Sequence, residues 1–305
     1  MNAGFVKVSV IIPTFGEPRF LKRAIQSVLS QSLEAIELII VDDNDPASDA
    51  RKKTEAIVSS FETIIYIKHP RNLNGATARN TGISYARGEY IAFLDADDEY
   101  DEKRLEVCYN AIVSSGQDFG GVYTGCIFYR SGKYYKRYLN VSSGNHLIET
   151  LACSFKFCSG SNIFVKASII KELGGFDESF QRHQDYEFLV RFFEKYSILA
   201  IKQPLLLKND ELINLPNVER IIQIKKQYLS KYQYIIDSLS KRKQRFIYGA
   251  HYYSICQLAL EEGDKDNYNC YFKKCGNQGQ LSFLRRVKLL LLRLKYSGKA
   301  HKGKK

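Results

Sequence analysis

Three carboxylates, Asp95, Asp97 and Asp98, give the sequence its clearest chemical signal, and they directly follow the apolar run 90–94. Acids this close together repel one another unless a cation lies among them. Their hard oxygen ligands suit Mg²⁺ or Mn²⁺, and either ion can bridge a diphosphate. The alternative interpretation is a cluster of acids that caps a following helix. The pattern by itself leaves both interpretations open.

A fourth carboxylate, Asp185, stands at the start of the amphipathic helix expected over residues 186–196. A carboxylate held there can act as a general base toward a hydroxyl group. Asp is also among the best helix N-capping residues, and capping does not exclude catalysis. The neighbouring His183 is interpreted as a positioning or surface residue rather than as a second base.

Two weaker signals come from Asp42-Asp43, which end another apolar run, and from Arg79, which lies in the segment 72–82. A strand-end acid can accept hydrogen bonds from a ribose or a base, although Asp in this position also commonly starts a turn. Arg79 can pair with a phosphate or with the acids. Taken alone, Arg79 would be interpreted as a solvated helix residue.

Alternating strands and helices are expected to position these residues. Continuous β-branched and apolar runs predict buried strands, and apolar residues at helical spacing predict the helices between them. The expected strands cover residues 6–12, 36–41, 64–67 and 90–94, and the expected helices cover 18–31, 52–61, 77–87 and 101–114. This order predicts an α/β fold with a mostly parallel central sheet and helices on both faces. Ligands of such sheets bind at the carboxyl ends of the strands, where the polar clusters fall.

Beyond the first hundred residues the sequence is less regular. A hairpin is expected from the segments 122–130 and 134–139, and a short helix is expected over residues 167–173. From about residue 215 the pattern is helical. We therefore expect three parts, and these are a main α/β domain over residues 1–210, a helical accessory region over 211–280 and a basic amphipathic tail over 281–305.

The net charge of +12 is concentrated near the end of the chain, because residues 285–305 carry nine Lys or Arg and no acid. The other residues carry a net charge of only +3, so the charge does not indicate a nucleic-acid-binding domain. As a helix, the tail gathers Leu284, Val287, Leu291 and Leu294 on one stripe, which suits an anionic membrane surface. The alternative is a helix that packs on its own domain.

The seven cysteines predict neither a disulfide framework nor a zinc site, because their number is odd and no Cys-x-x-Cys pair occurs. Reduced thiols in a cytosolic protein are the expectation. The apolar run near the N-terminus is too short for a signal peptide, and no stretch of about 18 apolar residues is present to span a bilayer.

Together these segments resemble the family-two inverting glycosyltransferases of the GT-A fold. The resemblance covers about residues 6–208 and rests on six motifs in the expected order, which makes a chance match improbable. The matching segments are Val8 to Phe15, Val41-Asp42-Asp43, Ala78 to Gly82, Leu94 to Asp98, Gly174 to Glu178 and Gln184-Asp185.

The resemblance implies a role for each matching residue. The residues expected to bind the nucleotide sugar are Pro13, Thr14, Phe15, Glu17, Asp43, Arg79 and Asp95. Asp97 would bind the metal, and Asp185 would be the catalytic base. Two positions depart from the family pattern, since Gln184 stands where a Glu is common and Gly16 stands where many members have Asn.

The implied reaction is transfer of a sugar from a nucleotide sugar, with a UDP-sugar as the expected donor class, to a hydroxyl group of a glycan or a lipid-linked acceptor. Mg²⁺ or Mn²⁺ would assist, and the protein would be cytoplasmic and peripheral at the inner face of the plasma membrane. One alternative is a nucleotidyltransferase, which the lack of a Gly-rich, Lys-containing loop near the first strand disfavours. The other is a basic nucleic-acid-binding protein, which the confinement of charge to the tail disfavours.

Overall fold

The computed structural model describes residues 5–209 and 216–297, and the chain divides into two compact units. The first unit contains residues 1–145 and 156–213, and the second contains 146–155 and 214–305. The segment 146–155 therefore belongs with the C-terminal helices, which sequence patterns did not indicate.

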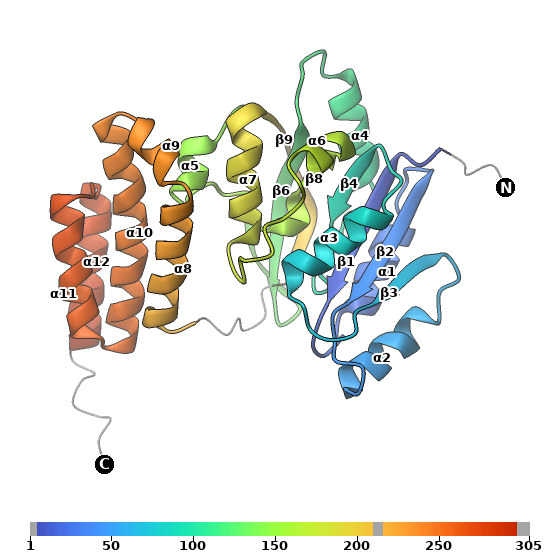
Figure 1. The fold of residues 1–305 in the computed structure, drawn as a ribbon, viewed down its shortest axis with the longest axis horizontal. Coiled ribbons are helices and arrows are strands. Elements are labelled where there is room, and N and C mark those ends of the chain that lie inside the picture. Colours follow the sequence, from blue (N-terminus) through green and yellow to red (C-terminus); the bar gives the residue numbers. More distant parts are fainter. Residues whose placement is uncertain (1–4, 210–215, 298–305) are drawn as a thin grey trace. The chain divides into compact units, whose positions relative to one another are not determined.

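The first unit is built on a nine-stranded sheet whose order is β3-β2-β1-β4-β8-β6-β9-β5, with β7 paired to β6 (Figure 1). Its strands are β1 Val8–Thr14, β2 Ile36–Asp42, β3 Ile64–Lys68, β4 Tyr90–Phe93, β5 Glu99–Tyr100, β6 Gly121–Arg130, β7 Lys133–Tyr138, β8 Phe164–Lys166 and β9 Ile198–Asn209. The four strands β3, β2, β1 and β4 are parallel, as expected, and the rest of the sheet is mixed.

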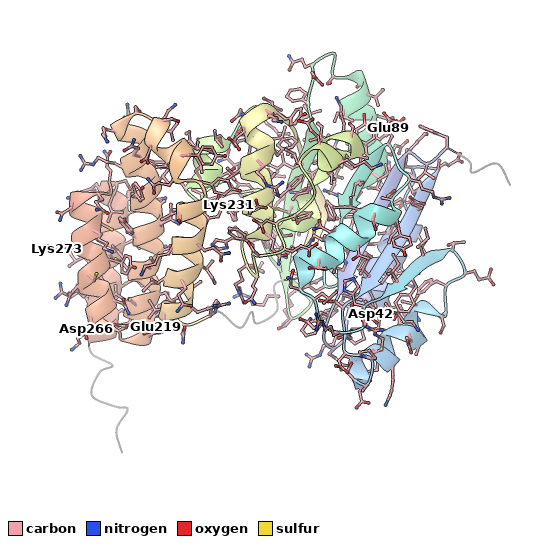
Figure 2. The ribbon with its side chains drawn as sticks, in the orientation of Figure 1. Asp42, Glu89, Glu219, Lys231, Asp266 and Lys273 are labelled. Atoms are coloured by element: carbon pink, nitrogen blue, oxygen red, sulfur yellow. A yellow bond between two sulfur atoms is a disulfide. The ribbon has the colours of Figure 1, made fainter. Side chains whose placement is uncertain are left out.

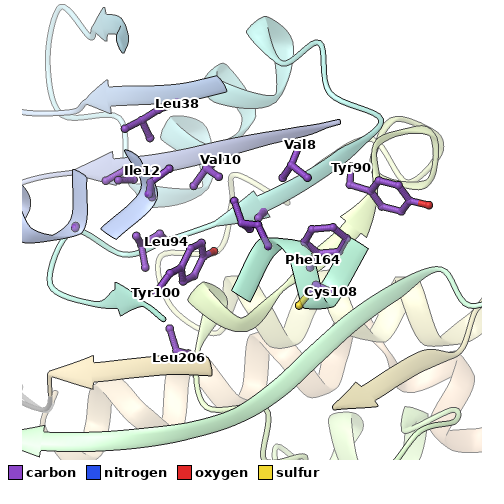
Figure 3. Packing of buried hydrophobic residues seen from close by; sticks show 14 of the residues in the cluster. Val8, Val10, Ile12, Leu38, Tyr90, Leu94, Tyr100, Cys108, Phe164 and Leu206 are labelled. Carbon is purple, nitrogen blue, oxygen red and sulfur yellow. The ribbon is translucent and has the colours of Figure 1, made fainter. Parts of the chain in front are cut away.

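Helices cover both faces of this sheet, which confirms the expected α/β class. They are α1 Leu21–Leu29, α2 Asp49–Val58, α3 Gly75–Tyr85, α4 Arg104–Ser114, α6 Ala167–Glu172 and α7 Gln184–Lys195, with the 3₁₀ turn η1 at Gly160–Asn162. Side chains of a strand alternate between its two faces. Accordingly, Val8, Val10 and Ile12 pack in one core with α1 and α4 (Figure 3). Ile11 points to the opposite face, where it packs against α3.

The close contact between α3 and β1 requires a glycine. A Cβ atom at Gly82 would lie 2.4 Å from Cγ2 of Ile11, so any larger side chain would push the helix away from the sheet. Arg79 and Asn80 lie on α3 about one turn before Gly82. The contact between Gly82 and Ile11 therefore also fixes how far these two side chains lie from the strand ends.

Three strands were not predicted from the sequence: β5, which has only two residues, and β8 and β9, which both matter for the site. β8 has only three residues, and β9 runs through Lys202, Gln203 and Pro204, where its pairing with β6 shifts register. Polar residues and a proline break the apolar pattern that would have identified a strand of twelve residues. β1 also ends two residues later than expected, so that Thr14 pairs with Asp42 at the carboxyl edge.

The second unit is helical, and among its described residues it consists of α5 Leu147–Leu151, α8 Val218–Lys231, α9 Gln233–Ser238, α10 Lys241–Glu262, α11 Lys265–Asn277 and α12 Phe283–Ser297. Its core gathers residues from α8, α10, α11 and α12, including Ile222, Ile255, Tyr271 and Leu289. No helix in the described ranges is long and apolar enough to cross a bilayer.

The cysteines differ from expectation at one pair. The sulfur atoms of Cys126, on β6, and Cys158, just before η1, are joined as a disulfide, so the expectation of seven reduced thiols is wrong for these two. They lie 32 residues apart in the sequence, and their proximity follows from the pairing of β6 with β8, which could not be foreseen.

Candidate active site

A cleft of about 760 Å³ lies at the carboxyl ends of the strands in the first unit. The site residues predicted from the sequence that line it are Pro13, Thr14, Phe15, Glu17, Asp43, Arg79, Asp95 and Asp97. Asp185 is not among the lining residues, although Gln181, a few residues before it, is. Segments from five separate regions of the chain therefore meet in one place, and four of them lie where the parallel order of the strands predicts.

The end of β1 presents an aromatic ring and a fixed turn to the cleft. Phe15 is 67% exposed, whereas Thr14 beside it is buried. Gly16 has φ +79° and donates its N–H to Oδ1 of Asn44 at 2.7 Å. Gly and Asn both tolerate this left-handed conformation, which explains why Gly can stand where many relatives of the family have Asn. Glu17 pairs with Lys53 at 2.9 Å.

Asp43 holds the loop that forms another side of the cleft. Its buried carboxylate accepts hydrogen bonds from the backbone N–H groups of Leu73 at 2.7 Å and Asn74 at 2.9 Å, and from Nδ2 of Asn72 at 3.0 Å. Nδ1 of His69 lies 2.7 Å away. A carboxylate offers about four acceptor sites, so these partners occupy it. Contact between Asp43 and a ribose stays a prediction, and its evident role is to order residues 72–74.

Asp42, by contrast, faces the interior. Its carboxylate is fully buried, and Nε of Arg51 lies 3.0 Å from its Oδ2. The same guanidinium donates to the carbonyl groups of Asn44 and of His69, the latter at 2.8 Å. Arg51 thereby ties together the segments that follow β2 and β3. The two adjacent acids therefore have different environments. Asp42 forms a buried ion pair, and Asp43 lies at the cleft.

The acidic cluster combines three different environments within 4.8 Å. Asp98 is fully buried, receives a hydrogen bond from Oγ of Ser161 at 2.7 Å and lies 3.1 Å from Nζ of Lys208. Asp95 is partly exposed and pairs with Nη2 of Arg79 at 2.7 Å. Asp97 is exposed. Two protein cations therefore offset part of the repulsion among the three acids.

The proton affinities of these groups follow from burial and from one another. Burial raises the pKa of Asp98 to about 7, with Asp95 and Asp97 adding to the rise and Lys208 opposing it. Burial would also raise the pKa of Asp95, but Arg79 and Lys208 outweigh it and hold that pKa below its usual range. Asp95 therefore stays ionised as a partner for cations.

These residues fit a divalent cation. Asp97 is exposed and offers carboxylate oxygens of the kind that Mg²⁺ or Mn²⁺ prefers, and the ionised carboxylate of Asp95 lies beside it. The alternative interpretation, a set of helix-capping acids, is wrong, because α4 begins only at Arg104 and its N-cap residue, Lys103, makes no side-chain cap.

Arg79 joins the acidic cluster to the start of α7. Its Nη2 pairs with Asp95, and its Nη1 donates to Oε1 of Gln184 at 3.0 Å. The side chain is only 14% exposed and lies over the ring of Phe176, so the solvated-arginine interpretation is wrong. Its Nε has no hydrogen-bond partner among the described residues, and this leaves one buried donor for a ligand.

The contacts of Gln184 explain why an amide can stand at this position, where the resemblance leads us to expect Glu. Its Nε2 donates to the carbonyl of Phe180 at 2.7 Å, while its Oε1 accepts from Arg79. A carboxylate cannot donate to a carbonyl group, so Glu at this position would lose one of the two contacts. The amide therefore holds Arg79 in place without adding a negative charge.

Asp185 follows as the second residue of α7, and His183, not Asp185, is the N-cap residue. Oδ1 of Asp185 accepts a hydrogen bond from the N–H of Tyr186 at 2.9 Å. Burial raises the pKa of Asp185, and nearby Asp95 adds to the rise, while the Tyr186 N–H and Arg79 oppose it. Asp185 therefore interacts electrostatically with Arg79 and Asp95. A carboxylate with a raised pKa can serve as a proton acceptor.

Asn80 fixes the loop that leads to α7. Its Oδ1 accepts from the N–H of Phe176 at 2.8 Å, and its Nδ2 donates to the carbonyl of the same residue at 2.9 Å. Gly175 has φ +72°, and a Cβ atom there would lie 2.4 Å from Oδ1 of Asn80. Two motifs that are almost a hundred residues apart are thus one structural unit.

Sequence reasoning missed Lys208 and Ser161, both of which contact Asp98. Lys208 lies on β9, the strand that went unrecognised, and Ser161 lies in the turn η1. The only signal was indirect, because a buried acid cluster requires compensating donors from some other part of the chain.

The amino-acid sequence is similar to a known family and to several known proteins. The model of the family described as glycosyl transferase family 2 matches residues 9–174. An uncharacterized glycosyltransferase of Methanocaldococcus jannaschii is 31% identical over 260 residues, which cover 83% of this chain and 86% of that protein. The amylovoran biosynthesis glycosyltransferase AmsB of Erwinia amylovora is 31% identical over 209 residues, which cover 66% of this chain and 68% of that protein.

Among solved structures, Staphylococcus aureus TarS in complex with UDP-GlcNAc is similar to this chain with a TM-score of 0.59. The match covers 91% of this chain and 93% of that chain at 14% sequence identity. A likeness at this identity concerns the fold, and it confirms the predicted fold class. It leaves the roles of individual residues to be argued from the site itself.

Proposed function

This chain belongs to glycosyl transferase family 2 and has a GT-A-like fold, and on this premise we propose that it is an inverting, metal-assisted transferase. It moves a sugar from a nucleotide sugar to a hydroxyl group of a glycan or a lipid-linked acceptor. The observation that carries the proposal is Arg79, which bridges Asp95 and Gln184 and so connects the acidic cluster to the helix of Asp185. Family membership also sets aside the nucleotidyltransferase and nucleic-acid-binding alternatives.

A UDP-sugar is the donor class that we propose. The exposed ring of Phe15 at the cleft supports it, because an aromatic face can stack on a nucleobase. UDP and UDP-GlcNAc are the ligands named for complexes of TarS. In this chain, Asp97 would hold the Mg²⁺ or Mn²⁺, which supplies positive charge at the diphosphate when it is bound, and Asp95 beside it would contact the donor.

In the proposed mechanism, Asp185 takes the proton from the acceptor hydroxyl as its oxygen attacks the anomeric carbon. The bond between that carbon and the diphosphate oxygen breaks at the same time, so the configuration inverts and no sugar becomes attached to the protein. The Arg79 guanidinium, held by Asp95 and Gln184, faces the charge that develops on the leaving diphosphate.

Donor binding is tested with a panel of nucleotide sugars, each with Mn²⁺ or with a chelator. We expect one UDP-sugar to stabilise the protein against heat by about 2.7 kcal/mol at a hundred times its Kd. Chelation or Asp97→Ala should remove the stabilisation, whereas Asp118→Ala, an exposed acid outside the cleft, should leave it unchanged. Stabilisation that survives both chelation and Asp97→Ala would refute the metal site, and no response to any nucleotide sugar would refute the donor class.

We also propose that α12 binds an anionic membrane, which would make the protein peripheral at the inner face of the plasma membrane. Leu289 is buried in the helical core, but Leu290, Leu291 and Leu294 are more than half exposed. Exposed cations accompany them at Arg286, Lys288, Arg293 and Lys295. Exposed leucines with flanking cations are typical of helices that lie in the surface of an anionic bilayer. Residues 298–305, the end of the predicted tail, lie outside the described residues.

Vesicle binding tests this surface without disturbing the fold, because the three leucines are already exposed. We expect the intact protein to co-sediment with phosphatidylglycerol vesicles and to bind phosphatidylcholine vesicles much less. The variant Leu290→Gln/Leu291→Gln/Leu294→Gln should lose binding to the anionic vesicles, because it removes the apolar contact but keeps the charges. Equal sedimentation of the variant and the unaltered protein would show that the leucines do not contact the bilayer.

A further inference from the structure

The helical unit contains a second cavity, of about 340 Å³, between α8, α10 and α11. Its lining includes three ammonium groups, on Lys225, Lys226 and Lys274, and the imidazole of His251. Among the described residues that line it, none is Asp or Glu. A cavity with several cations and no lining acid favours an anionic ligand.

Lys225 is the most informative of these residues. Its side chain is buried, with only 7% of the residue exposed, and no acid lies among the described residues that line the cavity around it. Its Nζ lies 3.5 Å from Nδ1 of His251, at the limit of a hydrogen bond. An ammonium group has three N–H donors, so a single distant acceptor leaves it poorly compensated.

His251 cannot supply the missing negative charge. Its Nε2 lies 2.8 Å from the carbonyl oxygen of Leu151, and because a carbonyl only accepts, Nε2 carries a proton. An imidazole carries no negative charge in any protonation state, and in the neutral ring with Nε2 protonated it is Nδ1 that accepts from Lys225. Burial of the ammonium lowers the pKa of Lys225, and the nearby thiol of Cys153 opposes this shift.

The other two lysines lie nearer the solvent. Lys226 is exposed, and Lys274 is half-buried with its ammonium 4.7 Å above the ring of Tyr271. A ligand that enters the cavity would thus meet Lys226 and Lys274 at the mouth and Lys225 at depth. The apolar side chains of Ile222 and Ile255 also line the cavity. Its volume of about 340 Å³ is larger than a single inorganic anion, so it has room for the rest of a small molecule.

We propose that this cavity binds the phosphate group of a phosphorylated small molecule, with Lys225 as the buried anchor. Three cations match the two charges and several acceptor oxygens of a phosphate better than they match a single carboxylate. The site lies within the helical unit and is independent of the sugar-transfer proposal. The phosphate can belong to a lipid headgroup or to a phosphorylated sugar, and the experiment separates these sources.

The test uses the full chain and the variant Lys225→Met, which keeps the length of the side chain but removes its charge. Thermal unfolding is followed in inorganic phosphate and in chloride at equal ionic strength. Phosphate should stabilise the unaltered protein, whereas Lys225→Met should be at least as stable in chloride and respond little to phosphate. The apparent affinity for phosphate should fall by about tenfold or more, the loss expected for one charge-assisted contact.

Lys273→Met is the matched control, because Lys273 is exposed on α11 outside the cavity lining (Figure 2). It should respond to phosphate like the unaltered protein. Phosphate bound at the cleft of the first unit would stabilise all three proteins equally, and that result would overturn the proposal. If Lys225→Met does not fold, the double variant Lys226→Met/Lys274→Met replaces it, and undiminished phosphate affinity in that variant would equally overturn the proposal.

Glycerol 3-phosphate and glucose 1-phosphate distinguish the source of the phosphate. Tighter Lys225-dependent binding of glycerol 3-phosphate supports a lipid headgroup, and tighter binding of glucose 1-phosphate supports a phosphorylated sugar. Binding of either compound that is unchanged in Lys225→Met places it elsewhere on the protein and counts against the site.

Discussion

Asp185→Asn is expected to reduce sugar transfer by at least about a hundredfold while donor binding stays intact, because the substitution removes a general base and little else. The amide keeps the size of the carboxylate, and its oxygen can still accept the hydrogen bond from the N–H of Tyr186. Asp185 does not line the cleft, so the Kd of the donor should not change. The measurement pairs the transfer rate with the Kd of the donor for both proteins.

The pH profile gives an independent check on the same residue. The base must be ionised to accept a proton, and burial raises the pKa of Asp185 above its ordinary value of about 3.9. The transfer rate should therefore fall as the pH decreases through that raised pKa. A variant with weaker donor binding but an undiminished maximal rate would contradict the assignment of Asp185 as the base.

Arg79→Met should produce the opposite combination, with loss of both donor affinity and rate. The substitution removes the ion pair with Asp95 and the contact with Gln184, and it withdraws the cation that faces the leaving diphosphate. Loss of such a preorganised donor costs about 10²–10³-fold in rate. Without Arg79 the pKa of Asp95 should also rise, because burial would be opposed mainly by Lys208.

Arg79→Lys separates charge from geometry. Lys keeps the positive charge but cannot make two parallel contacts to a carboxylate and an amide, so we expect an intermediate loss. Arg71→Met, at an exposed arginine outside the cleft, is the control and should be close to neutral. Full activity in Arg79→Met, with an unchanged donor Kd, would show that Arg79 has a purely structural role.

The parallel half of the fold and most of the cleft were predictable because they depend on local patterns. Each apolar run ends in polar residues, and parallel strands place those ends at one edge, so Phe15, Asp43 and Asp97 could be brought together from the sequence. The interpretation of Arg79 required the fold, since a helix arginine near strand ends is as often solvated as paired.

What could not be predicted depends on contacts between distant segments. β9 is paired to β6 with a shifted register, and nothing in its sequence marks Lys208 as the partner of a buried acid. In the sequence, Gln184 is only a departure from the expected Glu. The structure explains the amide, because it accepts from Arg79 and donates to the carbonyl of Phe180. The disulfide partners Cys126 and Cys158 likewise meet only through sheet pairing.

The hydrogen bonds of Asn80 to Phe176 have a consequence for protein engineering by recombination. Asn80 makes paired contacts with the backbone of Phe176, and Gly175 has no room for a side chain against it. A chimera whose crossover point falls between residues 80 and 175 would join an α3 and a loop selected in different parents. Functional hybrids with relatives should therefore inherit α3 and the segment 174–178 as one block, whatever is exchanged around them.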